Sequence, residues 1–339
     1  MMADVSASRS AGRLQGLVGL LSSEIGRLAV LTLFIFVALS LLDPSRFLTM
    51  ANFSSMAFQF PEFAILALAM MLAMMTGGID LSVVGLSNLS AVVAALILSH
   101  FAGDAATGVV AGSTIAAAMV AALVVGALGG LVNGIAIGYF GLPAILATLG
   151  SGLVFTGLAV ATTGGSAVLG FPVAFAFLGN GDVFGIPVPL IVFVIIAVIV
   201  WLVLERTALG LKIQMLGTNA LAARFIGIDD FGVTIRTYVL SGLFASSAGL
   251  VIMSRANSAK ADYGSSYLLL SILICVLGGI NPYGGFGKVA GLVLAVLSLQ
   301  FLSSGLNMLQ VSNFAKDLIW GGLLLLVMVA NAIQSRRQI

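Results

Sequence analysis

The sequence predicts an all-α protein, a polytopic bundle of about ten transmembrane helices (eight to ten) with cytoplasmic N- and C-termini. Of its 339 residues, 60% are hydrophobic and only 8% are charged, and the mean hydropathy is +1.21. A soluble globule carries roughly 25% charged residues, so this composition cannot cover a water-facing surface. In hydrocarbon the backbone must satisfy its own polar groups, which leaves helices or a closed barrel. The runs Leu190–Leu204 and Ile319–Val329 lack the alternation of barrel strands.

Apolar runs of about 20 residues, the length that crosses a bilayer, define the expected spans. Lys and Arg are absent from Phe47 to Glu205, which marks a long stretch of membrane-embedded chain. The spans form one transmembrane domain over 27–335, between a segment 1–26 and a tail 336–339 that are both assigned to the cytoplasm. The third expected span starts after Gly77-Gly78 and ends near 101, and the fourth covers 107–128 or extends to Tyr139. The other expected spans are 27–42, 56–76, 144–162, 188–204, 235–254, 266–280, 286–303 and 315–333.

The distribution of basic residues predicts the orientation, because cytoplasmic loops carry the excess of Lys and Arg. The 205–236 segment is rich in basic residues and the 163–187 loop has none. We therefore expect both termini and 205–236 in the cytoplasm and 163–187 outside, which requires an even number of spans. The basic residues concerned are Arg9, Arg13 and Arg27 before the first span, Arg206, Lys212, Arg224 and Arg236 in the loop, and Arg336 and Arg337 after the last span.

Two kinds of local pattern describe how the helices meet. Glycine recurs at every fourth position in Gly126, Gly130, Gly134 and Gly138, which gives one helix a face without side chains and favours close helix packing. Pro61 and the Gly77-Gly78 pair are expected to kink or break helices, and broken helices at membrane depth line cavities or lie buried in protein. The single cysteine, Cys275, excludes an intrachain disulfide.

The segment 205–236 is the longest hydrophilic stretch and contains a short helix pattern bounded by glycines, 216–228. Asn219 is suited to cap its N-terminus. Small residues and one basic side chain on a cytoplasmic helix suit docking into a groove of a partner; the alternative is a helix that only lies at the membrane interface. The residues assigned to this coupling role are Gly217, Asn219, Ala222, Ala223, Arg224, Gly227 and Ile228.

Polar residues inside the apolar spans are the candidates for a solute path, because charged and polar groups at membrane depth are costly and usually functional or paired. Asp80 either caps the third span or contacts solute. The polar side chains of Asn88, Asn133, Thr148 and Asn307 have two possible roles. They could bind the hydroxyl groups of a sugar, or they could form hydrogen bonds between helices. Glu62 faces either a vestibule or solvent. The candidate path and helix-breaking positions are Gly77, Gly78, Asp80, Ser82, Asn88, Asn133, Thr148 and Asn307.

Several of these segments together resemble one family, the ribose-type permeases of bacterial ATP-binding-cassette importers, which include permeases for simple sugars and autoinducer-2. The segment 217–228 resembles its cytoplasmic coupling loop, Gly-x-Asn-x-x-Ala-Ala-x-x-x-Gly-Ile. Val84 and Ile145 depart from the family pattern, where glycine and phenylalanine are commoner, and the solute stays open. The other matching segments are Met75–Val83, Asn133-Gly134 with Leu142–Gly150, Leu277–Gly279 with Gly284–Gly287, and Gly305–Asn307.

The resemblance implies a permease subunit of the bacterial inner membrane that forms the path for a sugar or sugar-like solute. It also implies the partners: a second permease subunit, identical or different, two cytosolic ATP-binding domains, a periplasmic solute-binding protein and membrane lipid, with no nucleic acid. The sequence itself has no Gly-x-x-x-x-Gly-Lys-Ser/Thr motif. We therefore expect no cofactor in this chain, with ATP and Mg²⁺ bound by the partner ATPase.

Two other function classes compete with this interpretation. An ion-coupled secondary transporter or channel needs coupling carboxylates or pore-lining rings, and the spans carry few ionisable residues. A membrane enzyme needs a metal cluster or a nucleophile and base, and one His, one Cys and scattered carboxylates offer none. Dependence of uptake on ATP or on an ion gradient separates the first alternative from the importer.

Overall fold

The computed structural model describes residues 23–336, so the expectations for Arg9, Arg13 and Arg337, and for most of the segment 1–26 and the tail 336–339, lie outside the described residues. Its elements are α2 (Glu24–Leu42), α3 (Pro44–Phe47), α4 (Met50–Met75), α5 (Val83–Phe101), α6 (Gly108–Gly138), α7 (Ala144–Thr163), η1 (Val173–Ala176), α8 (Phe177–Asn180), β1 (Asp182–Val183), β2 (Ile186–Pro187), α9 (Val188–Arg206), α10 (Ala208–Thr218), α11 (Ala220–Phe225), α12 (Asp230–Ala256), α13 (Tyr267–Leu277), α14 (Val289–Met308) and α15 (Asn313–Arg336).

The predicted all-α membrane bundle is confirmed, with one small antiparallel hairpin, β1–β2, as its only sheet within the described chain. Among the described residues eight helices are long and apolar enough to cross a membrane: α2, α4, α5, α6, α7, α9, α12 and α14. Many large apolar side chains on the outer helices are exposed, as in Leu153 of α7 and Leu325 of α15. Such a surface suits hydrocarbon as its solvent rather than water.

Two expected spans differ in the structure. The span expected at 266–280 is helix α13, whose 11 residues rise about 16 Å, roughly half of the ~30 Å hydrocarbon core. The span expected at 315–333 is α15, which has 24 residues but is not one of the eight candidate spans. The third span begins as a helix only at Val83, because 76–82 is non-helical.

Pro61, expected to kink or break its helix, does not break it, since α4 runs from Met50 to Met75. The break at Gly77-Gly78 does occur, because α4 ends immediately before it. Proline removes one backbone donor and a helix can tolerate that loss, whereas Gly77 adopts a φ of +86°, which ends helical geometry. The helix therefore continues through the proline and ends at the glycine pair.

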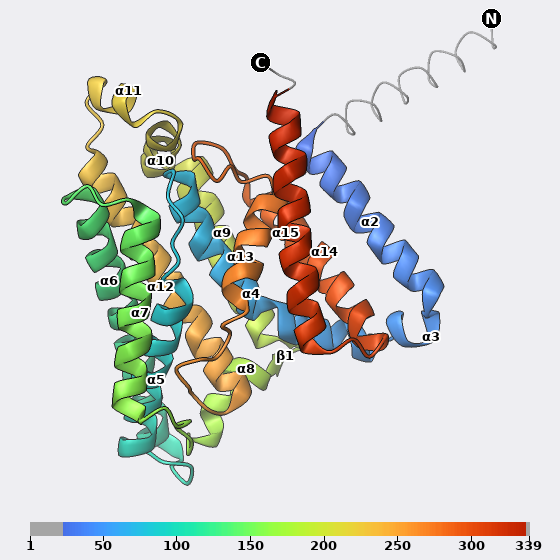
Figure 1. The fold of residues 1–339 in the computed structure, drawn as a ribbon. Helices are drawn as coiled ribbons and strands as arrows, with labels where there is room; N and C mark the ends of the chain where they lie inside the picture. The colour runs from blue at the N-terminus through green and yellow to red at the C-terminus, as the bar shows by residue number, and fades with distance from the viewer. Residues whose placement is uncertain (1–22, 337–339) are drawn as a thin grey trace, which may run out of the picture.

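Helices α4 and α12 form the centre of the bundle (Figure 1), and the other long helices surround them. Every residue of α4 from Phe60 to Met75 is buried. One apolar core surrounds α4 and includes α9, α13 and α14, and a second lies between α5, α6 and α7. The long apolar run of α4 is therefore a core helix that is hydrophobic on all sides.

The glycine stripe of α6 packs against α12, as the packing interpretation predicted. A Cβ atom at Gly130 would lie 2.1 Å from the carbonyl oxygen of Tyr238, and one at Gly126 would lie 2.4 Å from that of Gly242. Gly242 in turn faces Gly126, where its own Cβ would lie 2.1 Å from the carbonyl oxygen. The two backbones touch, so no side chain fits between them.

The predicted sidedness agrees with how the elements are grouped. The start of α2, the end of α15 and the helices α10 and α11 lie at one end of the bundle, and α8 with the β1–β2 hairpin lies at the other (Figure 1). The basic residues of 205–236 and the loop 163–187, which has no basic residue, are therefore at opposite ends. Which end faces the cytoplasm stays a prediction from the charge distribution.

Replacing Gly130 with Ala should destabilise the bundle by about 1–3 kcal/mol, the usual cost of overpacking, because the new methyl group meets backbone that cannot rotate away. Gly112 lies on the same helix, and no atom lies within 4 Å of the position that a Cβ would take there. Gly112→Ala is therefore the matched control and should be neutral or slightly stabilising. Thermal melting in detergent measures both. Equal melting temperatures for the two variants would show that the stripe is not a packing surface.

Candidate functional site

The segment 76–82 between α4 and α5 carries non-helical backbone into the bundle, and neighbouring side chains satisfy it. Thr148 of α7 accepts a hydrogen bond from the Leu81 amide at 3.0 Å, and its hydroxyl lies 2.9 Å from the carbonyl oxygen of Ile79. Gly78 fits because its Cα faces the hydroxyl of Tyr238 and the methyl of Ala144, within 2.7 Å of where a Cβ would be. The break is thus held in place by α7 and α12.

Asp80 is buried in this segment and is bound by hydroxyl and amide donors. Its Oδ1 accepts from the Ser82 amide (3.0 Å) and the Ser82 hydroxyl (2.6 Å), and its Oδ2 accepts from the hydroxyl of Ser241 on α12 (2.9 Å). Helix α5 begins at Val83 after Ser82 as its N-cap residue, so Asp80 is not the cap itself. It fixes the turn that precedes the helix and joins that turn to α12.

Asn133 and Asn88 complete the interior polar network from two other elements. Asn133 of α6 donates to the Ser82 hydroxyl at 2.7 Å. Asn88 of α5 donates to the carbonyl oxygens of Ala261 and Tyr263, at 2.9 and 2.8 Å, in the non-helical loop between α12 and α13. A second irregular stretch of backbone is therefore satisfied by a side chain of a neighbouring helix, as a hydrocarbon environment requires.

Glycines from three distant segments meet where α4, α10 and the 278–288 loop come together. The Gly285 amide donates to the carbonyl oxygen of Met75 at 3.0 Å, which joins the end of α4 to that loop. A Cβ at Gly217 would lie 2.0 Å from the Met75 oxygen and 2.4 Å from the Gly285 nitrogen. Gly77 and Gly284 pack against the backbone of Gly217 at the same place. We call these four residues, Gly77, Gly217, Gly284 and Gly285, the glycine junction.

Helix α11 projects from the end of the bundle beside α10 (Figure 1). Asn219 caps it, accepting a hydrogen bond from the Ala222 amide at 2.9 Å, as the sequence predicted. Gly227, with a φ of +83°, follows its end. Gly217, expected to lead into this helix, instead lies in the last turn of α10. Arg224 donates to Asp230 at 2.7 Å, which ties α11 to the start of α12.

The outer surface of α11 is more apolar than the sequence interpretation recognised. Leu221, Phe225 and Ile226 are exposed, Phe225 at 83% of its area. Ala223, assigned to a docking surface, is only 2% exposed and packs into this chain, whereas Ala222, the other assigned alanine, is exposed. Large exposed apolar side chains on a polar segment favour contact with a partner.

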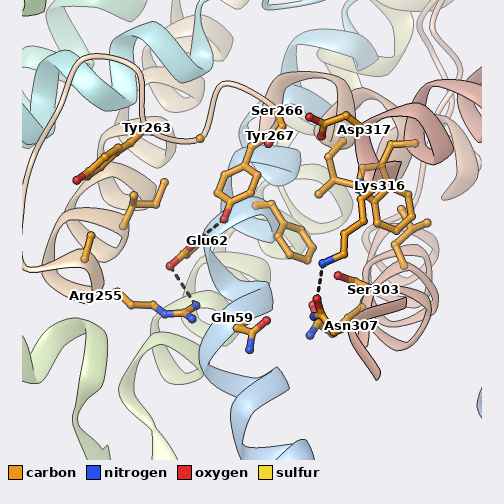
Figure 2. Close-up of a pocket in the computed structure, with 18 residues that line it drawn as sticks. Gln59, Glu62, Arg255, Tyr263, Ser266, Tyr267, Ser303, Asn307, Lys316 and Asp317 are labelled. Atoms are coloured by element: carbon orange, nitrogen blue, oxygen red, sulfur yellow. Dashed lines mark hydrogen bonds and ion pairs between the residues drawn. The ribbon is translucent and has the colours of Figure 1, made fainter. Parts of the chain in front are cut away.

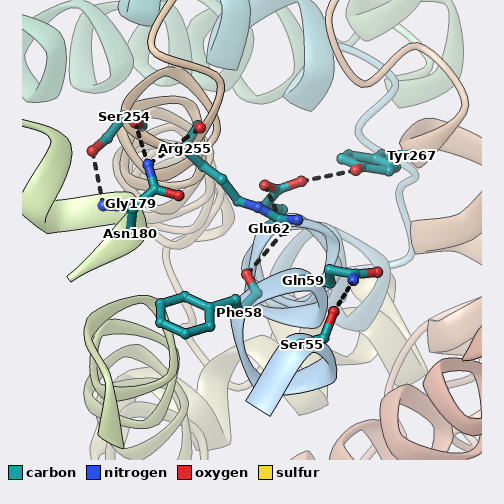
Figure 3. A network of polar contacts seen from close by, with 9 residues as sticks. All are labelled: Ser55, Phe58, Gln59, Glu62, Gly179, Asn180, Ser254, Arg255 and Tyr267. Atoms are coloured by element: carbon teal, nitrogen blue, oxygen red, sulfur yellow. Dashed lines mark hydrogen bonds and ion pairs between the residues drawn. The ribbon is translucent and has the colours of Figure 1, made fainter. Parts of the chain in front are cut away.

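A cavity of about 690 Å³ opens between α4, α12, α13, α14 and α15 (Figure 2). On one wall Glu62 of α4 accepts a hydrogen bond from Arg255 of α12 at 3.1 Å and one from the Tyr267 hydroxyl of α13 at 2.8 Å. Arg255 also donates to the carbonyl oxygen of Phe58, in the α4 turn before Pro61 (Figure 3). Glu62 therefore joins three helices and is not a free charge.

The opposite wall of this cavity comes from α14 and α15. Asn307 of α14 accepts a hydrogen bond from Lys316 of α15 (Figure 2). A second cavity of about 410 Å³ adjoins the first and shares Gln59, Gln300 and Asn307 with it. Near the loop that borders the cavity, Lys260 donates to Asp262 at 2.8 Å, and this hydrogen bond raises the pKa of the exposed Lys260 ammonium.

The structure divides the predicted path residues into two groups. Asp80, Ser82, Asn88, Asn133 and Thr148 are buried and bound to one another or to backbone, which agrees with interhelical hydrogen bonding. Asn307 lines both of the cavities described above, and none of the other predicted path residues lines either of them. Sequence reasoning missed Arg255, Tyr267 and Gln300, although the lone Gln300 within an apolar span was a signal that could have been used.

Comparisons with known proteins agree on one family. The family model described as the permease component of branched-chain amino acid transport systems matches residues 52–328. The chain is similar to the autoinducer 2 import system permease protein LsrD of Yersinia enterocolitica, with 34% identity over 216 residues, 62% of this chain and 65% of that protein. The LsrD proteins of Yersinia pseudotuberculosis and Yersinia pestis are 33% and 32% identical over the same length.

The chain thus spans 65% of the length of the curated relatives that it matches. No solved structure matches it significantly.

Replacing Asp80 should separate a structural role from a charge-dependent one. Asp80→Asn keeps an acceptor for Ser82, and the Ser241 hydroxyl can turn to accept from the new amide, so we expect near-normal assembly and uptake. Asp80→Leu leaves buried donors unpaired and should cost about 1–3 kcal/mol for each. Melting temperature and uptake are measured separately. Loss of uptake in a fully assembled Asp80→Asn variant would instead assign the charge to solute.

The glycine junction makes a second prediction. Gly217→Ala places a methyl group against the backbone of Met75 and Gly285 and should lower the free energy of unfolding by about 1–3 kcal/mol. Gly150 of α7 has no atom within 4 Å of a Cβ position, so Gly150→Ala is the control. Thermal melting compares them. A Gly217→Ala protein as stable as wild type would mean that α10 is not packed on the end of α4.

Proposed function

Since the chain belongs to the family of permease components of branched-chain amino acid transport systems, we propose that it is the membrane-spanning subunit of an ATP-driven importer for a sugar or sugar-like solute. Membership of this family makes it a transport subunit rather than an enzyme, and with the eight candidate spans it supports a multi-pass protein of the bacterial inner membrane. The family-level resemblance stated from the sequence motifs is thereby confirmed.

The observation that carries the coupling proposal is the surface of α11. A capped, exposed helix at the basic end of the bundle presents Leu221, Phe225 and Ile226 outward. Such side chains bury well in a groove of a partner, where a few anchors supply most of the binding energy. The occupant is a cytosolic ATP-binding subunit, because this chain lacks its own ATP-binding motif and the basic residues assign this end to the cytoplasm.

The remaining parts of the importer follow from the same assignment. A second permease subunit, identical or different, completes the translocation path, two ATP-binding subunits dock on the two α11 helices, and a periplasmic protein delivers the solute to the opposite end. The solute class is proposed from the curated relatives, which are named for autoinducer 2 import. Ribose, other monosaccharides, rhamnose and autoinducer-2-like molecules are the members to test.

The rival function, an ion-coupled transporter or channel, needs a membrane-embedded carboxylate free to bind and release the ion. Within the described chain Asp80 is bound to two serines, and Glu62 is bound to Arg255 and Tyr267. These two carboxylates are thus committed to the fold, which supports coupling to ATP through α11. Uptake that persists without ATP and stops when the ion gradient collapses would favour the rival.

Changing Phe225 to Asp tests the docking surface. The charge should weaken association with the ATP-binding subunits about tenfold or more, because it replaces an apolar anchor, and should leave membrane insertion unchanged. Phe184, fully exposed in the β1–β2 turn at the other end, provides the matched control Phe184→Asp. Co-purification and solute-stimulated ATP hydrolysis are measured for both. If Phe225→Asp associates and hydrolyses as Phe184→Asp does, α11 is not the coupling helix.

A further inference from the structure

The 278–288 loop covers the end of the central helix α4. The Gly285 amide donates to the carbonyl oxygen of Met75, the last residue of α4, at 3.0 Å. The second half of α4 is buried on all sides, and Met75 is fully buried. The loop therefore lies over the middle of one end of the bundle and not along its lipid-facing perimeter. Figure 1 shows it next to α10, at the end of the bundle that carries α11.

Hydrogen bonds inside this loop fix its shape. The Asn281 amide donates to the carbonyl oxygen of Phe286 at 2.9 Å, and the Asn281 carbonyl oxygen accepts from the Gly284 amide at 3.0 Å. The Asn281 side chain accepts from the Tyr283 amide, also at 3.0 Å. Residues 281–286 are thus ordered before any partner binds, so their contact with a partner costs little conformational entropy. We call residues 281–286 the aromatic loop.

Two large aromatic side chains project from the aromatic loop. Tyr283 is 88% exposed and Phe286 is 65% exposed. Because the loop lies over the centre of the bundle's end, both rings are at the water-facing side of the protein rather than beside the lipid. Exposed apolar surface in such a place marks a site of contact with another protein. Aromatic side chains are also enriched at the centres of protein interfaces.

The aromatic loop touches the segment that leads into α11. A Cβ atom at Gly285 would lie 2.3 Å from the hydroxyl oxygen of Thr218, and one at Gly284 would lie 2.6 Å from the carbonyl oxygen of Gly217. Thr218 is the last residue of α10, and Asn219 after it caps α11. The aromatic loop and α11 are therefore joined through the backbone of the glycine junction.

We propose that the aromatic loop is a second contact for the ATP-binding subunit that docks on α11, with Tyr283 and Phe286 as its anchors. The inference deepens the proposed function and rests on it for the identity of the partner. The aromatic loop and α11 form one platform, because both are held by the glycine junction. The loop also leads directly into α14, which begins at Val289. The partner thus acts on α14 through the second contact and on α10 through α11.

Photo-crosslinking in the assembled importer tests the contact. Benzoylphenylalanine replaces Tyr283, Phe286, Phe225 or Phe184, one at a time, in the full chain reconstituted with the second permease subunit and the ATP-binding subunits. The first three positions should capture the ATP-binding subunit. Phe184, fully exposed in the β1–β2 turn at the other end, should not. Capture of lipid alone, or of a permease subunit alone, from Tyr283 and Phe286 would overturn the proposal.

Tyr283→Asp measures the strength of the contact. Because the charge replaces an exposed aromatic anchor, the affinity for the purified ATP-binding subunits should fall about tenfold. The side chain is exposed, so the melting temperature of the permease should stay at the wild-type value. Phe184→Asp is the matched control and should keep the wild-type affinity. Wild-type affinity in Tyr283→Asp would contradict a second contact.

The crosslinking positions separate this inference from the proposed function. If Phe225 captures the ATP-binding subunit and neither Tyr283 nor Phe286 does, the docking role of α11 stands and the second contact fails. If Tyr283 and Phe286 capture it and Phe225 does not, the second contact stands and α11 is not the docking helix. If none of the three positions captures it, both assignments fail.

Discussion

The bundle depends on satisfying non-helical backbone inside a low-dielectric interior. Hydrocarbon offers no water to free amides and carbonyls, so irregular segments persist there only when neighbours bind them. Thr148 and Asp80 hold the segment 76–82, and Asn88 holds the carbonyls of Ala261 and Tyr263. The polar residues at membrane depth thus stabilise two interrupted helices, and this role accounts for their burial more directly than contact with solute does.

Close backbone contact also links the end of α4 to α10, which precedes the proposed docking helix α11. At the glycine junction Met75 at the end of α4 binds the Gly285 amide, and Gly217 of α10 lies against both. Backbone contacts have no side-chain rotamers to absorb a shift, so a displacement of α10 is passed to the start of 76–82 and to the loop before α14. Close-packed interfaces of this kind change between discrete arrangements rather than deform gradually. Movement of the partner that we propose to dock on α11 would therefore have a direct mechanical route into the bundle.

The sequence predicted the membrane bundle, most spans, the α6 packing stripe and the Asn219 cap, because each depends on composition or on short local spacing. It did not predict that α13 is half a span, because a short apolar run with apolar neighbours resembles a full one. It did not predict that Ala223 faces inward, since which side of a six-residue helix is buried depends on the packing of α10 and α12. The Glu62–Arg255–Tyr267 contact was also missed, because its members are far apart in sequence and meet only when α4, α12 and α13 pack together.

Helix α14 connects the larger cavity to the glycine junction. Its start follows the 278–288 loop, which contributes Gly284 and Gly285 to that junction, and Asn307 near its end lines the cavity. A ligand shifts a conformational equilibrium only through different affinities for the two states. A molecule that bound in the cavity with different affinities in the two states would therefore act on a helix whose preceding loop packs against α10, which leads into the proposed docking helix α11.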